Sequence, residues 1–123
     1  MVVEWIVSTT DGVTIIRLKG EIDLLHSPDL RALLQTQLKN QVAALLVDFT
    51  EVSYIDSSGL ATLVEYYQKS QPYGGRVALA GLSPRVRSIF GLVRLNEIFP
   101  IFETAALARA ELLRTGAAGL SAG

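Results

Sequence analysis

Residues 43–67 read AALLVDFTEVSYIDSSGLATLVEYY, and this stretch decides the fold class. Its first part, Ala43–Phe49, is a short and nearly continuous apolar run, which predicts a strand buried on both faces or nearly so. Apolar residues three or four apart then predict a helix: Leu60, Leu63, Val64 and Tyr67. A buried strand followed by an amphipathic helix is typical of α/β proteins.

The chain before this stretch predicts a hairpin and a first helix. Residues 2–10 and Val13–Leu18 are rich in β-prone side chains, and Asp11-Gly12 between them favours a tight turn. Ser27-Pro28 provides a cap and a first-turn proline for a helix. One face of that helix carries four leucines: Leu30, Leu33, Leu34 and Leu38.

The chain after this stretch alternates strands and helices. The second helix should stop near Pro72–Gly75. A strand (Arg76–Ala80), a helix opened by Ser83-Pro84, an edge strand (Ile98–Phe102, with Pro100) and a last helix (Thr104–Arg114) follow. The order ββαβαβαβα predicts an α/β fold: a single-layer mixed sheet with an N-terminal antiparallel hairpin, parallel inner strands and helices packed on it. Residues 1–114 should form one domain and 115–123 a flexible tail.

Composition narrows the function classes. The 123 residues include 11 basic and 12 acidic side chains, without a basic run, so nucleic acid is not an expected partner. Cysteine is absent, and no apolar run approaches the roughly 18 residues that span a bilayer. Glu4 stands where a signal peptide would be basic. We expect a cytoplasmic domain with no membrane insertion, no metal and no cofactor.

The turn Asp56-Ser57-Ser58-Gly59 lies where a buried strand feeds a helix, the place where ligands gather in α/β sheets. Asp56 or Ser57 could simply cap the helix. If Ser57 is the cap, Ser58 keeps a hydroxyl with no local partner. A phosphate there would lie at the positive end of the helix dipole, so Ser58 is the expected acceptor and Ser57 the second choice.

Four segments occur in order at familiar spacings: Gly20-Glu21-Ile22-Asp23, Leu45–Phe49, Ile55–Leu60 and Leu82–Val86. On these segments the chain from about residue 3 to 113 resembles a STAS domain, the anti-sigma factor antagonist family. The resemblance implies a bacterial partner-switching protein that is not an enzyme. Its unphosphorylated form would bind an anti-sigma factor, and phosphorylation by that serine kinase would release it; a phosphatase is a possible further partner.

The resemblance also implies site residues. Ser58 would accept the phosphate, Asp23 would lie beside it, and Asp56 would hold the turn. The implied partner-binding surface is Asp23, Asp56, Ser57, Ser58, Gly59 and Leu60.

Three positions carry separate expectations. Ala61 stands where many relatives have glycine or another small residue, which we expect to be harmless. Arg94 stands where a glycine often ends the third helix, so the Leu92–Asn96 connection should differ in shape. Tyr66 lies off the apolar stripe and is expected to be solvated or to mark a contact surface.

Four alternatives remain open. A hydrolase would use Ser57 or Ser58, but Ser57 has Gly59 two residues ahead and Ile55 two residues behind, so the Gly-x-Ser-x-Gly turn fails there. The only histidine, His26, is expected to be a solvated surface residue. A phospho-aspartate receiver would use Asp48, but no acidic pair follows the first strand. Gly74-Gly75 is too short to cradle a nucleotide phosphate. A noncatalytic STAS adaptor of a transport complex or stress-signalling assembly would have the same fold.

Overall fold

The computed structural model describes the backbone of residues 4–122 and the side chains of residues 7–114. Its elements are β1 (Glu4–Thr10), β2 (Val13–Ile22), α1 (Ser27–Lys39), β3 (Ala44–Ile55), α2 (Ser57–Ser70), β4 (Arg76–Ala80), α3 (Pro84–Leu92), β5 (Ile101–Phe102) and α4 (Ala105–Ala122), with short 3₁₀ turns η1 (Gln71–Tyr73) and η2 (Leu95–Glu97). The sheet order is β1-β2-β3-β4-β5. Only the β1–β2 pair is antiparallel, which confirms the predicted fold class.

The N-terminal hairpin turns at Asp11-Gly12, as predicted. Both residues have positive φ, 54° and 82°, and the strands pair from Thr10 with Val13. Two positive φ values match the right-handed twist of a hairpin, which is why this dipeptide is favoured there. Residues 2 and 3 of the predicted first strand lie outside the described residues.

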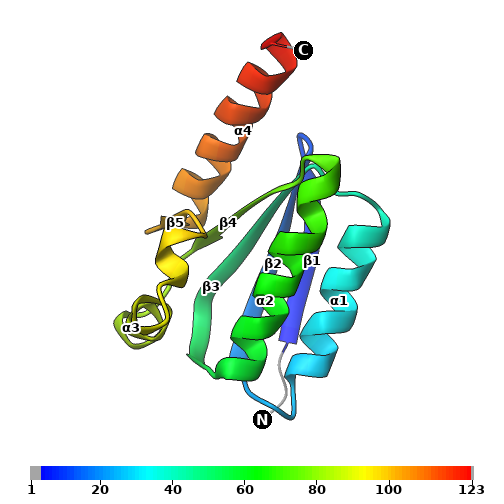
Figure 1. The fold of residues 1–123 in the computed structure, drawn as a ribbon. Helices are drawn as coiled ribbons and strands as arrows, with labels where there is room; N and C mark the ends of the chain where they lie inside the picture. Colours follow the sequence, from blue (N-terminus) through cyan, green and yellow to red (C-terminus); the bar gives the residue numbers. More distant parts are fainter. Residues whose placement is uncertain (1–3, 123) are drawn as a thin grey trace.

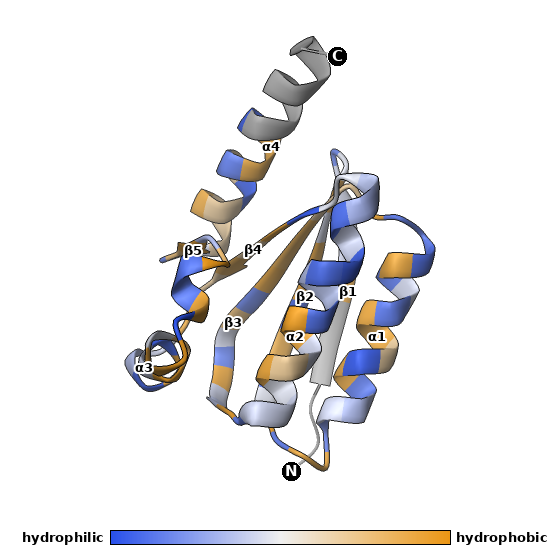
Figure 2. Cartoon of the chain, viewed as in Figure 1, coloured by the Kyte–Doolittle hydropathy of each residue, from blue (hydrophilic) through white to orange (hydrophobic). Residues whose placement is uncertain are grey.

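The sheet separates two apolar layers (Figure 1). On one face α1, α2 and α3 cover a cluster that includes Leu45, Val47 and Phe49 of β3. On the other face α4 contributes Ala108 and Leu112 to a cluster with Ala44, Leu46 and Ala78. In Figure 2 β4 is almost entirely coloured as hydrophobic. The central strands are therefore buried on both faces, as Ala43–Phe49 predicted.

The strands β2 and β3 end together at one edge of the sheet. The strand β3 extends past the predicted end at Phe49 to Ile55, and Ile55 pairs with Ile22, the last residue of β2. Two residues that follow these strands, Asp23 and Asp56, therefore leave the sheet side by side. This edge carries the candidate site.

Other boundaries differ from the prediction. The strand β5 is limited to Ile101–Phe102, with Pro100 just before it. The helix α4 was expected to end at Arg114, but its backbone is helical to Ala122, so the expected tail begins as helix. Within residues 4–122 no helix combines the length and the apolar character needed to cross a membrane.

Two expectations about single residues were wrong. Arg94 does not lack the left-handed stop: it adopts φ 61° itself, and its Nε donates to Glu97 Oε2 at 2.6 Å. Tyr66 is 2% exposed rather than solvated. Its hydroxyl and that of Tyr73 are buried without a hydrogen bond among the described residues. Burial raises the pKa of Tyr66, and the Tyr73 hydroxyl nearby adds to the shift.

Candidate functional site

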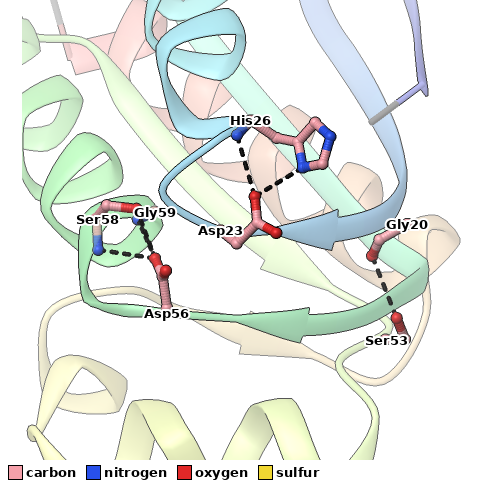
Figure 3. Close-up of polar contacts among 7 residues, drawn as sticks. All are labelled: Gly20, Asp23, His26, Ser53, Asp56, Ser58 and Gly59. Carbon is pink, nitrogen blue, oxygen red and sulfur yellow. Dashed lines mark hydrogen bonds and ion pairs between the residues drawn. The ribbon is translucent and has the colours of Figure 1, made fainter. Parts of the chain in front are cut away.

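Two loops meet at the edge where β2 and β3 end. The Asp56 N–H donates to the carbonyl of Ile22 at 3.0 Å, which continues the β2–β3 ladder one residue past its last pair. Figure 3 shows Asp23 and His26 on the first loop, Asp56 at the second connection, and Ser58 and Gly59 in the first turn of α2. The first loop leads into α1 and the second into α2.

Asp56 is the N-cap of α2. Its backbone is extended, and its Oδ1 accepts from Ser58 N at 2.9 Å and Gly59 N at 3.3 Å. Of the two cap residues that the sequence offered, Asp56 is therefore the cap and Ser57 is not, because an aspartate carboxylate directly after the ladder reaches the N–H groups two and three residues on. Ser57 is the first helical residue; it is exposed, and its hydroxyl has no hydrogen-bond partner within the described part of the chain.

The Ser58 hydroxyl is not spare, in contrast to the prediction. Its Oγ donates to Asp56 Oδ1 at 2.5 Å, a short charge-assisted hydrogen bond. Burial opposes ionisation of Asp56, but the bonds from the Ser58 hydroxyl and from the N–H groups of Gly59, Ser58 and Leu24 outweigh burial and hold the pKa of Asp56 below its usual range.

Asp23 and His26 form a clamp across the first loop. Asp23 Oδ1 lies 2.7 Å from His26 Nδ1 and accepts from His26 N at 3.1 Å. Although burial opposes it, these His26 contacts lower the pKa of Asp23, so the carboxylate is ionised near neutral pH. An ionised carboxylate only accepts hydrogen bonds, so His26 carries a proton on Nδ1.

His26 is 7% exposed, and the expectation of a solvated histidine was wrong. The sequence held a signal for this arrangement, because an acid three residues before a histidine in a short loop can form such a pair. No hydrogen bond joins His26 to Ser57 or Ser58 among the described residues, so the geometry offers no Ser–His nucleophile pair.

Gly59 and Leu60 lie on the core side of the turn. Leu60 is 7% exposed and belongs to the core. Gly59 is buried, and a Cβ on it would lie 2.7 Å from Ile22 Cγ2 and 2.8 Å from Ile55 Cγ1. The side chains at the surface of the turn are those of Asp23, Asp56, Ser57 and Ser58, with Ser57 the most exposed.

Sequence reasoning missed two surface residues beside the turn. Leu24 and Leu25, in the first loop, are 75% and 77% exposed. Glu21 does not join the clamp; it lines a separate hollow of about 390 Å³ with Ser53, Tyr54 and Arg85.

The receiver hypothesis gains no support from Asp48. Its Oδ1 accepts from the Thr50 N–H at 2.9 Å and the Thr50 hydroxyl at 2.5 Å, and its Oδ2 lies 3.6 Å from Arg17. Among the side chains of residues 7–114 no three histidine or acidic groups are placed together as metal ligands would be.

Fold and site together define a small α/β domain with a mixed five-stranded sheet and a serine turn at its carboxyl edge. A family model, the STAS domain, matches residues 4–108. The chain belongs to the STAS domain family.

Relatives and solved structures agree with this assignment. The chain is 35% identical over 86 residues to the "Anti-sigma-B factor antagonist" of Bacillus subtilis, covering 70% of this chain and 78% of that one. A crystal structure of an anti-sigma factor antagonist from Mycobacterium paratuberculosis superposes with a TM-score of 0.83 at 26% identity, covering 89% and 93% of the two chains. The Bacillus cell fate determinant SpoIIAA in its phosphorylated form has the same fold, with a TM-score of 0.71 at 23% identity and coverage of 89% and 99%.

Proposed function

We propose that this chain is an anti-sigma factor antagonist that works by partner switching. Unphosphorylated, it binds an anti-sigma factor that is also a serine kinase; phosphorylation of Ser58 releases it. The protein acts in the cytoplasm by binding and not by catalysis, without direct contact to nucleic acid, and a phosphatase resets it. The observation that carries this proposal is the Ser58 hydroxyl, oriented by Asp56 at the start of α2 on the open edge of the sheet.

The geometry around Ser58 suits a phosphate acceptor. Because the hydroxyl proton points to Asp56 Oδ1, the oxygen lone pairs are directed elsewhere, and the carboxylate polarises the O–H bond. A phosphate on Ser58 would lie at the N-terminus of a 14-residue helix, where backbone N–H groups and the helix dipole favour negative charge. Ser57 is more exposed, but no hydrogen bond joins its hydroxyl to a carboxylate within the described residues.

Phosphorylation would change the charge of the surface more than its fold. A phosphoserine adds about −1.5 to −2 charges next to Asp56, whose pKa is already low, and removes the proton that joins Ser58 to it. A partner carboxylate roughly 6 Å from the new charge would be repelled by on the order of 5 kcal/mol at an effective dielectric of about 20, before salt screening. A tenfold loss of affinity needs only about 1.4 kcal/mol.

The test uses the purified chain, ATP and each anti-sigma factor kinase of the source cell, expressed one at a time. We expect one kinase to add a single phosphate, placed on Ser58 by mass spectrometry, with Ser57→Ala still phosphorylated and Ser58→Ala not. Ser58→Asp should bind that kinase at least tenfold more weakly. Phosphate on Ser57 alone would contradict the assignment, and tight binding by Ser58→Asp would contradict the repulsion mechanism. If no kinase binds or phosphorylates the chain, an adaptor role replaces partner switching.

A further inference from the structure

Two adjacent leucines face solvent beside the Ser58 turn. Leu24 and Leu25 are 75% and 77% exposed, and they occupy the loop between β2 and α1. A pair of large apolar side chains left in water at one place is a common mark of a contact surface. These two residues lie outside the partner-binding set that the sequence indicated.

The loop that carries the leucines is held in one conformation. The Asp23 carbonyl accepts from His26 N at 3.1 Å and from Ser27 N at 2.8 Å. The Asp23 carboxylate accepts from the backbone N–H and from the ring Nδ1 of His26. At the start of the loop, the Ile22 carbonyl accepts from the Asp56 N–H at 3.0 Å. A loop fixed before binding loses little conformational entropy on binding.

The leucine loop and the Ser58 turn start side by side. The Ile22 carbonyl, directly before the loop, accepts from the Asp56 N–H at 3.0 Å, and Asp56 holds the Ser58 hydroxyl, so a protein that reaches Ser58 also meets the leucine loop. Charged groups determine whether this surface accepts or rejects the partner, but exposed carboxylates add little affinity by themselves. Apolar side chains that enter a pocket on the partner provide most of the affinity.

We propose that Leu24 and Leu25 are the apolar anchor by which the anti-sigma factor selects this chain, seated in an apolar pocket beside the kinase site, and that His26 is the positioning residue that holds the anchor. This inference rests on the proposed function. The anchor supplies affinity and specificity, and phosphoserine supplies the release. The two contributions are separable by mutation because the leucines lie in the loop between β2 and α1, whereas Ser58 lies in the first turn of α2.

The first experiment measures the affinity of the kinase that phosphorylates Ser58, by calorimetry, for the double variant Leu24→Ser/Leu25→Ser. We expect a loss of at least 30-fold, about 2 kcal/mol. The matched control is Leu107→Ser, which removes a leucine that is 55% exposed on α4, a helix that packs on the opposite face of the sheet; its affinity should stay within threefold of wild type. The weakening caused by phosphorylation should have the same ratio in the double variant as in wild type.

The second experiment tests the clamp. His26→Leu should bind at least tenfold more weakly, and His26→Asn, whose amide N–H can replace Nδ1–H toward Asp23, should restore affinity to within threefold. Thermal unfolding of each variant reports folding separately, so rescue of binding at equal stability identifies positioning.

The outcomes separate this inference from the proposed function. If Ser58 phosphorylation releases the kinase but the leucine double variant binds within threefold of wild type, the anchor is overturned and partner switching stands. If His26→Asn fails to rescue a folded protein, the positioning role is overturned. If the wild-type chain neither binds nor is phosphorylated, both proposals fail.

Discussion

Replacing Gly59 by alanine tests how closely α2 must approach the ends of β2 and β3. A Cβ at this position would lie 2.7 Å from Ile22 Cγ2 and 2.8 Å from Ile55 Cγ1, and both isoleucines are completely buried. Distances below 3.0 Å between carbon atoms require movement, and the neighbours have little free space. The N-terminus of α2 must therefore shift away from the sheet, which strains the cap made by Asp56.

The expected magnitude follows from two opposing terms. Alanine favours a helix over glycine by up to about 1 kcal/mol. Overpacking a closed core costs about 1–3 kcal/mol. We therefore expect Gly59→Ala to lower the free energy of unfolding by about 1–2 kcal/mol and, by displacing Ser58, to slow its phosphorylation.

Gly91 provides the matched control. It lies in α3, and a Cβ built on it meets no atom within 4 Å. Gly91→Ala should therefore raise the free energy of unfolding by about 0.5–1 kcal/mol. Urea denaturation of the two variants and wild type measures the difference between the variants, which should be about 1.5–3 kcal/mol. Equal stability of Gly59→Ala and Gly91→Ala would refute the close-contact argument.

Three further changes test electrostatics and the core. Hydrogen bonds lower the pKa of folded Asp56, so ionised Asp56 stabilises the fold above its unfolded pKa near 3.9, and this contribution is lost as the pH falls through the folded pKa. In Asp56→Asn the free energy of unfolding, measured by urea denaturation at about pH 2–7, should therefore fall less steeply as the pH decreases than in wild type. An unchanged pH dependence would contradict this. Arg31 donates two hydrogen bonds to Glu65 across α1 and α2, at 2.9 and 2.8 Å. A double-mutant cycle with glutamine at both positions should give a coupling of about 0.2–1 kcal/mol that weakens in about 1 M salt, and a salt-independent coupling would argue against a surface pair. Tyr66→Phe should leave the free energy of unfolding unchanged or raise it by up to about 1 kcal/mol, because the buried hydroxyl has no hydrogen-bond partner among the residues that the structure describes; a clear loss of stability would reveal a partner.

Helix starts were predictable only where the preceding backbone is extended. Ser83-Pro84 opens α3 as expected, with Ser83 at ψ 160° and its hydroxyl accepting from Val86 N at 3.2 Å. The same dipeptide at Ser27-Pro28 gives no side-chain cap. The residue before it, His26, is already near helical geometry, with φ −100° and ψ −18°, because its N–H and that of Ser27 bond back to Asp23. The local sequence is equivalent, and the clamp determines the outcome.

The predicted apolar stripe of α2 does face the core, since Leu60 and Leu63 are buried and Val64 and Tyr67 pack against them, but the stripe was incomplete for a physical reason. The buried residues of this helix are Gly59, Leu60, Thr62, Leu63, Tyr66 and Ser70. Small or polar residues occupy half of these positions, so the buried face does not appear as an apolar pattern. Small residues let the helix approach its neighbours closely, which leaves Tyr66 in the core. A pattern of hydrophobicity alone cannot detect a face selected for size.

The cap at Asp56 shows how a register decided what the sequence left open. Asp56 and Ser57 are both good cap residues, and local propensity does not separate them. The difference comes from the partner strand: β3 pairs with β2 through Ile55, so Asp56 is the first residue beyond the pairing, still extended, with its carboxylate facing the helix that begins. Ser57 is then helical, and the Ser58 hydroxyl is bonded to Asp56. The proposed acceptor role of Ser58 thus depends on an oriented hydroxyl and not on an unoccupied one, and it makes Asp56 a part of the switch as well as the cap of its helix.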